Sequence, residues 1–388
     1  HPPMKETWNT DLYRRVHQAL CKIKIVDTHE HLQSIEQLPP TAEVTIGRLL
    51  QFLTSSDLIS AGMPPEDMRR VADGRSGLSP KERWKLMAPW YKFARNSVYF
   101  DALRIAMRDL YDVEDFAEDT VDKLTDAMQR EVRPGITRKV FDKANIDFCM
   151  NNPFGSALVF RPCAEPEEFI IDMHDQFTEF PIARLAEETN IDIRSLDDYL
   201  RGIDVMFERY APIACAYKIP RGYDRPIFFE DVPQHQVENT FLRLLAFNDR
   251  PDRRELQALE DFVLHYVCRK CGEHGLRMKV HCGHQEGTNN IVGNARAALL
   301  TNLFQKYRKT NFDIYHISYP HWEEVVSIVK TFPNVTVNFC FNWVINPKAS
   351  RHALSVMLDC VPASKIHGFG GDYLYVEGSY GHAVIARR

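Results

Sequence analysis

From residue 145 onward, the chain alternates short apolar runs with longer amphipathic stretches. Such alternation is typical of successive strand and helix units that build a parallel sheet. Apolar runs predict strands at residues 24–27, 145–150, 212–219, 277–281, 312–317, 335–339 and 366–370. One further strand is predicted near residues 177–185. Together they make eight strands, the number that a (β/α)8 barrel requires.

Apolar positions at helical spacing fall between the predicted strands. They predict helices over residues 196–209, 256–274, 294–307, 322–331 and 353–360. The final predicted strand leaves room for only a turn or two of helix before the last residue. The barrel therefore either closes in an unusual way or the natural chain continues beyond Arg388.

A long segment without barrel strands separates the first predicted strand from the second. Residues 33–144 are far too many for one strand-to-helix loop, and they are rich in helix signals, such as the run 100–111. We therefore expect an α/β fold, a distorted (β/α)8 TIM barrel formed by residues 1–388 as a single domain. Residues 33–144 would be a helical insertion after strand 1 that caps the mouth of the barrel.

Composition narrows the class of protein. The 48 Lys and Arg residues against 53 Asp and Glu residues give a net charge of −5, without a long run of either sign, which argues against nucleic-acid binding. No apolar stretch approaches the roughly 18 residues that a membrane span needs. Nine scattered cysteines do not indicate a disulfide framework. We expect a cytoplasmic protein that acts on a small-molecule substrate, has no nucleic-acid or membrane partner, and could form homo-oligomers.

The strongest chemical signal is a pair of histidines at the end of the first predicted strand. His29 and His31 stand two residues apart in the segment VDTHEHL, residues 26–32. Alternate residues of a strand point to the same face, so the two imidazoles project together. Such a pair can bind one divalent metal ion through neutral ring nitrogens. Glu30 points to the opposite face, where it would pack or support the ligands.

Three further side chains stand at the ends of later predicted strands. His281 ends the strand at 277–281, His316 lies at the end of the strand at 312–317, and Asp372 follows the last strand. Barrel enzymes build their sites at the carboxyl ends of their strands. We therefore expect these three residues and the histidine pair to converge on one mouth.

This ordered set resembles the amidohydrolase superfamily of metal-dependent barrels. Lys218, at the end of the fourth predicted strand, stands where many members carry a carboxylated lysine between two metal ions. Local sequence also resembles the amidohydrolase-related branch that is similar to the N-terminal part of certain glutamine-synthetase-like fusions. The segments that carry this second resemblance are residues 217–219, 280–284, 316–320 and 333–335.

The resemblance implies a cofactor and a mechanism. One or two divalent ions, Zn first and Mn or Fe as alternatives, would be held by a ligand set of His29, His31, His281, His316, Asp372 and Lys218. A bound ion would lower the pKa of water, and Asp372 would act as the general base. His316 would be a second-metal ligand or, with one metal, an electrophile and proton donor. Lys218 would be catalytic either as a carboxylated bridge or as a plain lysine that contacts an anionic substrate group.

Residues after the strands are candidates for substrate binding. His284 follows His281 by three residues, and rim positions supply the others: Arg184, Arg221, Trp343 and Arg387. Because arginine pairs well with carboxylates, we expect a carboxylate-bearing substrate.

Four functions fit this set of residues. The first is hydrolysis of an amide, lactone or ester by metal-activated water. The second is uronate isomerisation, because uronate isomerases share the HxH pair, the strand-five His, the strand-eight Asp and a large helical insertion. The third is nonoxidative decarboxylation, and the fourth is metal binding without catalysis. His316 and Lys218 favour the hydrolase.

Overall fold

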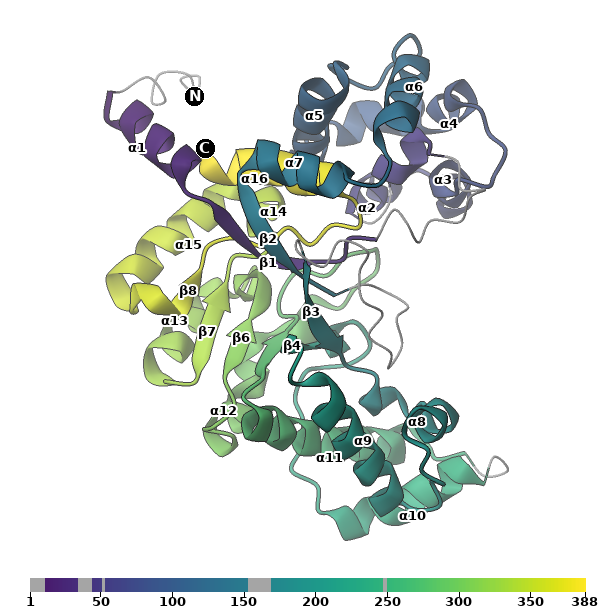
Figure 1. The fold of residues 1–388 in the computed structure, drawn as a ribbon, viewed down its shortest axis with the longest axis vertical. Helices are drawn as coiled ribbons and strands as arrows, with labels where there is room; N and C mark the ends of the chain where they lie inside the picture. Colours follow the sequence, from purple (N-terminus) through teal and green to yellow (C-terminus); the bar gives the residue numbers. More distant parts are fainter. Residues whose placement is uncertain (1–10, 34–43, 51–52, 153–168, 247–249) are drawn as a thin grey trace.

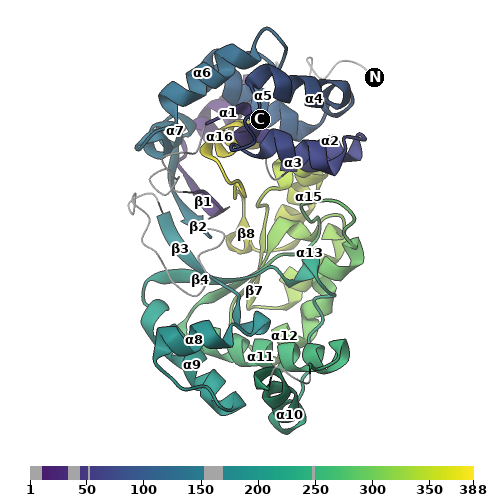
Figure 2. The same cartoon turned by 90° about the vertical axis from the view of Figure 1, so that its right-hand side faces the viewer.

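Eight parallel strands in sequence order form one sheet that curls into a barrel (Figure 2). The computed structural model describes residues 11–33, 44–50, 53–152, 169–246 and 250–388. The predicted α/β TIM-barrel fold is confirmed. The strands are β1 (Ile25–Glu30), β2 (Ile146–Asn151), β3 (Phe169–His174), β4 (Ala214–Ile219), β5 (Arg277–Val280), β6 (Phe312–Ile314), β7 (Val335–Asn338) and β8 (Ile366–His367).

The chain after β8 links the last part of the barrel to the first. Although β8 has only two residues, the backbone that follows it runs along β1. The amide of Asp372 donates to the carbonyl oxygen of His29 at 2.9 Å, and the amide of His31 donates to that of Tyr373 at 3.0 Å. This closure places Asp372 directly beside the histidine pair of β1.

Helices alternate with the strands and surround the sheet (Figure 1). The helices outside the insertion are α1 (Asp11–Lys22), α8 (Ile182–Thr189), α9 (Leu196–Tyr210), α10 (Gln234–Leu245), α11 (Arg253–His274), α12 (Thr301–Lys306), α13 (Trp322–Thr331), α14 (Asn342–Ile345), α15 (Pro347–Cys360) and α16 (Val376–Arg387). Short 3-10 helices are η3 (Ile46–Leu50), η4 (Phe177–Glu179), η5 (Arg221–Tyr223), η6 (Val292–Ala295), η7 (Ala297–Leu300), η8 (Tyr315–Ser318) and η9 (Ala363–Lys365). Among the described residues, no helix has the length and apolar character needed to cross a membrane.

The predicted helical insertion after strand 1 is confirmed. Its α-helices are α2 (Leu53–Ser60), α3 (Pro65–Ala72), α4 (Pro80–Ala94), α5 (Val98–Tyr111), α6 (Val121–Glu131) and α7 (Ile136–Ala144). A capping box begins α4, because the Ser79 hydroxyl accepts from the Glu82 amide while the Glu82 carboxylate accepts from the Ser79 amide. Helices α2 to α6 gather at one end of the molecule, and α5 packs against α16 (Figure 1).

The predicted third strand is wrong in position. Residues 177–185 contain the 3-10 helix η4 and the beginning of α8, whereas the strand lies earlier, at Phe169–His174. Pro181 precedes α8, and Leu185 is the residue of this helix that is buried. Such a segment presents one apolar stripe at helical spacing, and the short apolar run before it supplies the strand.

Three helix boundaries also differ from expectation. The helix expected at 294–307 is broken into η6, η7 and α12. Helix α15 begins at Pro347, earlier than predicted, because the Asn346 side chain caps it by accepting from the Ala349 amide at 3.1 Å. Helix α16 has 12 residues rather than a turn or two.

Candidate metal centre

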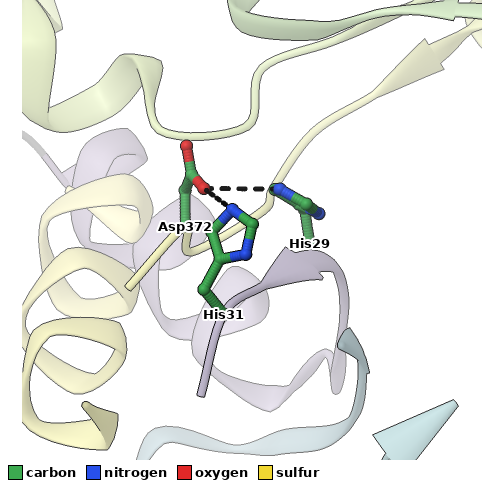
Figure 3. Close-up of side chains that lie close together, drawn as sticks. All are labelled: His29, His31 and Asp372. Atoms are coloured by element: carbon green, nitrogen blue, oxygen red, sulfur yellow. Dashed lines mark ion pairs between the residues drawn. The ribbon is translucent and has the colours of Figure 1, made fainter. Parts of the chain in front are cut away.

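His29, His31 and Asp372 meet at the carboxyl end of the barrel (Figure 3). Oδ1 of Asp372 lies 3.4 Å from Nε2 of His29 and 3.2 Å from Nε2 of His31. All three side chains are buried, and one ligand-type atom from each lies within 4.8 Å of the others. The chain thus assembles two neutral-nitrogen donors and one carboxylate from β1 and the loop after β8.

A hydrogen bond orients the His31 imidazole toward Asp372, and a nearby carboxylate faces the far nitrogen of the His29 ring. Nδ1 of His31 donates to the carbonyl oxygen of Asn152 at 2.5 Å, which leaves Nε2 facing the carboxylate. Nδ1 of His29 lies 3.8 Å from the carboxylate of Asp172, on the side away from Asp372. A partner on the far ring nitrogen fixes the tautomer and ring orientation of metal-binding histidines.

His281 and His316 extend the cluster on the side of β5 and β6. Nε2 of His316 lies 3.1 Å from Nδ1 of His281 and 3.7 Å from Oδ2 of Asp372. The remaining ring nitrogens are held by backbone, since Nδ1 of His316 bonds to the Cys340 carbonyl oxygen at 2.9 Å and Nε2 of His281 to that of His284 at 3.0 Å. The predicted convergence of the four histidines and the aspartate is therefore present in the structure.

Lys218 also reaches this centre, as its position at the end of β4 predicts. Its Nζ lies 3.1 Å from Nε2 of His29 and 4.7 Å from the centroid of the Tyr315 ring. The lysine is fully buried, and burial lowers its pKa. A buried amine beside the histidines is available for either role that the sequence predicts.

The sequence analysis missed Cys340. Its Sγ forms a second group of ligand-type atoms with His316 and Asp372, again within 4.8 Å of one another. The residue follows β7 by two positions. Its position just after a strand could have indicated a site residue. A single cysteine in an apolar run, however, is usually a small core residue.

His174 was missed for a different reason. It ends β3, and Nδ1 lies 2.8 Å from the Asn152 side-chain oxygen. Burial first, and then the charges of His31 and Lys218, lower its pKa to about 3. Because the third strand was predicted in the wrong place, His174 was not recognised as a residue at a strand end. Its position after the run 169–173 is nevertheless equivalent to that of His281 after β5.

The electrostatics of the cluster favour metal binding. Burial lowers the pKa of His29 and His281 well below the usual value, and that of His316 to about 4. Burial alone would raise the pKa of Asp372, but the hydrogen bond to His31 and the nearby charges outweigh it and hold this pKa below its usual range. Neutral imidazoles and an ionised carboxylate are the forms that bind divalent ions.

Two buried carboxyl groups hold the loop that carries Asp372. Asp27 accepts from the Gly371 amide at 2.9 Å, and Glu30 accepts from the Tyr373 amide at 2.7 Å. Asp372 itself has φ 66°, a left-handed conformation that few non-glycine residues adopt. Burial raises the pKa of Asp27 to about 6 and that of Glu30 well above its usual value. Glu30 thus supports the loop, consistent with the supporting position expected for it.

Of the residues predicted to bind substrate, some lie next to the histidine cluster and others lie away from it. His284 lies next to His281 through its carbonyl oxygen. Trp343 instead donates from Nε1 to the Gly368 carbonyl oxygen at 2.8 Å and lines a separate cavity of about 630 Å³ between α5 and α14–α16. Of these two residues, His284 alone borders the histidine cluster.

Arg184 and Arg221 line another cavity, of about 890 Å³, beside α8 and α11. Arg221 is buried and lies 3.2 Å from the carboxylate of Glu260. Arg184 is half-exposed and lies 3.9 Å from Glu188 on its own helix. Both guanidinium groups are engaged with protein carboxylates outside the histidine cluster, so the structure does not support their predicted role.

Arg387 lies at the opposite end of the barrel, and its predicted contact with substrate is wrong. Its guanidinium donates to the carbonyl oxygens of Ala144, Asn145 and Ile23 at 2.6, 3.2 and 3.3 Å. These carbonyls precede β1 and β2, at the amino ends of the strands. Although α16 follows β8, its last turn runs back to the base of the barrel.

Replacing Arg387 by methionine should therefore reduce stability and spare activity. Methionine keeps an apolar stem but loses the three donors, so we expect the free energy of unfolding to fall by about 1–2 kcal/mol. Urea unfolding measures this loss, and kcat/KM should stay within a factor of about two. Arg184→Met, which removes a half-exposed ion pair, is the control with little effect on stability. A tenfold rise in KM for Arg387→Met would contradict this placement.

The fold and the buried cluster define a class, the TIM-barrel enzymes with a candidate histidine–aspartate metal site at the carboxyl ends of their strands. Within that class, residues 240–387 match the family model described as amidohydrolase. This match covers the part of the chain from β5 to β8 and agrees with the resemblance to the amidohydrolase superfamily that the sequence pattern indicates. No curated protein matches the sequence.

Solved structures share the fold at low sequence identity. A uronate isomerase from Thermotoga maritima has a TM-score of 0.75 and 13% identity, over 96% of this chain and 88% of that chain. A glucuronate isomerase from Caulobacter crescentus has a TM-score of 0.73 and 15% identity, over 96% and 85%. A presumed metal-dependent hydrolase from Lactobacillus casei has a TM-score of 0.67 and 11% identity, over 96% and 88%. At these identities the likeness shows the fold alone.

Proposed function

We propose that this chain is a metal-dependent hydrolase that cleaves an amide, lactone or ester bond of a small molecule. The observation that supports this proposal is the pair of ligand groups that share Asp372. One group adds His29 and His31, and the other adds His316 and Cys340. Two adjacent metal positions are characteristic of sites that activate water and stabilise the developing charge.

The residues present fit a divalent ion. His29, His31 and Asp372 would hold one ion, and His316, Cys340 and the same aspartate a second. Nitrogen and sulfur donors favour Zn²⁺, while the carboxylate leaves Mn²⁺ and Fe²⁺ as alternatives. A carboxylated Lys218 would add oxygen ligands beside His29, and mass spectrometry of the intact protein would detect that modification.

A bound ion would supply a lowered pKa for water and polarisation of the substrate carbonyl. The protein's own groups would handle the proton. Asp372, held ionised by its histidine neighbours, accepts a proton from the attacking water and returns it to the leaving group. The hydrogen bond between His31 and the Asn152 carbonyl fixes the imidazole that faces this carboxylate. The loop pinned by Asp27 and Glu30 keeps the carboxylate in place.

Uronate isomerisation is the second candidate. The likeness to the two isomerase structures covers 96% of the chain and therefore includes most of the inserted helices. In that reaction, the same aspartate would move a proton between substrate atoms rather than activate water.

Metal analysis and a substrate panel test the proposal. The purified protein should contain stoichiometric divalent metal by mass spectrometry, and His31→Ala should lose most of it. His235→Ala, which removes an exposed histidine, is the matched control. The panel consists of N-acyl amino acids, γ-glutamyl amides, lactones and uronates. At least one amide or lactone should be hydrolysed, with loss of activity on chelation and recovery with Zn²⁺. Turnover of a uronate while every amide and lactone stays intact would support the isomerase instead.

A further inference from the structure

A cavity of about 510 Å³ lies between the helical insertion and the loop after β5. Ser56 of α2 stands on one wall, and His284 and Glu286 stand on the other. The two walls are joined, because the Ser56 hydroxyl donates to the Glu286 carboxylate at 3.4 Å and accepts from the Gly287 amide at 3.1 Å. Helix α2 and the barrel loop therefore form one built pocket.

Two residues that line this cavity, His284 and Tyr99, connect it to the histidine cluster. His284, which lines it, accepts through its carbonyl oxygen from the ring of His281. Tyr99, at the start of α5, also lines it, and its ring stacks on Phe341 with centroids 5.1 Å apart. Phe341 in turn contacts the ring of His316. A molecule bound with its reacting group at the cluster could extend into the cavity.

The groups that line the cavity can form hydrogen bonds with the hydroxyl groups of a ligand. Tyr99 is only 9% exposed, and its hydroxyl has no hydrogen-bond partner within the described part of the chain. Burial raises the pKa of Glu286 to about 7, so its carboxyl can either donate or accept near neutral pH. Thr288 and Asn289 add hydroxyl and amide groups, and none of the described lining residues is a lysine or arginine.

These properties argue against a charged occupant. A carboxylate would face Glu286 and Asp57 without a cation among the described lining residues. An ammonium group donates only, and would leave the proton of the Tyr99 hydroxyl without an acceptor. A hydroxyl group donates and accepts at once, so it can satisfy the phenol and the carboxyl together.

We infer that this cavity binds a hydroxyl-bearing part of the substrate, with Tyr99 and Glu286 as specificity-determining residues. The inference rests on the proposed function, which concerns the bond that is cleaved. It adds that the rest of the substrate carries hydroxyl groups. It also replaces the expectation that arginines select a carboxylate, since Arg184, Arg221 and Arg387 all lie elsewhere.

Three amides of similar chain length test this inference. Equilibrium binding of D-gluconamide, hexanamide and 6-aminohexanamide is measured by calorimetry on the purified protein with its native metal. Ammonia release is measured in parallel. We expect D-gluconamide to bind at least about tenfold more tightly than hexanamide, because buried polar groups discriminate against ligands that leave them unpaired.

Conservative variants assign the preference to the two residues. Tyr99→Phe and Glu286→Gln should each reduce the ratio of the two affinities by about threefold to tenfold. Tyr111→Phe is the matched control, because its hydroxyl donates to Glu377 outside the cavity, and it should keep the ratio.

Several results would overturn the inference. These are equal affinities, no binding of D-gluconamide, tighter binding of 6-aminohexanamide, or unchanged ratios in both cavity variants. The two readouts separate the proposals. If the protein prefers the hydroxyl-bearing amide but hydrolyses no amide, lactone or ester of the panel, the result supports hydroxyl binding in the cavity and contradicts the proposed hydrolase activity. Hydrolysis without that preference does the reverse.

Discussion

Asp372→Asn is expected to lower kcat by about a thousandfold while the protein stays folded. Asparagine nearly matches aspartate in shape but cannot accept the proton that the carboxylate takes, and a positioned general base contributes about 10²–10⁴-fold. The carboxylate also stands within 3.4 Å of the imidazoles of His29 and His31, so the variant should bind metal more weakly. Steady-state kinetics on the best substrate of the panel, with metal analysis of the same sample, measure both effects.

Asp175→Asn provides the matched control for this change. Asp175 is also buried in the barrel, where it accepts from the hydroxyls of Tyr217 and Thr178, and burial raises its pKa. The asparagine oxygen can accept from the Tyr217 hydroxyl, and its NH2 group can donate to the Thr178 hydroxyl, so activity should stay close to that of the wild type. Circular dichroism would establish that both variants fold. If Asp372→Asn kept kcat within tenfold of the wild type, Asp372 could not be the general base.

The part of the site that the sequence predicts well depends on two rigid geometric rules. Alternation along a strand puts His29 and His31 on one face, and parallel topology brings the carboxyl ends of all strands to one mouth. Residues at strand ends, such as His281, His316 and Asp372, therefore converge whatever the loops do. The structure brings these candidate ligands within a few ångströms of one another.

The residues that sequence reasoning misplaced are those whose position depends on tertiary packing. A strand and a short amphipathic helix compete for residues 169–189, and the apolar pattern alone does not decide between them. That one error also hid His174. Arginine has a long, flexible side chain that can reach acceptors on several neighbouring elements. The contacts of Arg387 therefore could not be predicted without knowing that α16 runs back to the base of the barrel.

Gly371→Ala is expected to destabilise the protein by about 3 kcal/mol and to lower kcat by about a hundredfold. A Cβ at this position would lie 1.7 Å from Oε1 of Glu30, which is fully buried and held by the Tyr373 amide. Either the glutamate or the loop must move, and overpacking of this kind costs about 1–3 kcal/mol, occasionally more. Because the next residue is Asp372, a shift of about 1 Å would misplace the carboxylate enough for that loss of rate. Urea unfolding and kcat measure the two effects.

Gly368→Ala is the matched control within the same segment, because a Cβ there meets nothing within 4 Å and the backbone conformation suits alanine. It should change neither stability nor kcat appreciably. Shortening the clashing side chain tests the cause, since Glu30→Asp relieves the overlap and the double variant with Gly371→Ala should lose less stability than the sum of the single changes. Additive losses, or equal behaviour of the two alanine variants, would show that the contact between Gly371 and Glu30 does not hold Asp372 in position.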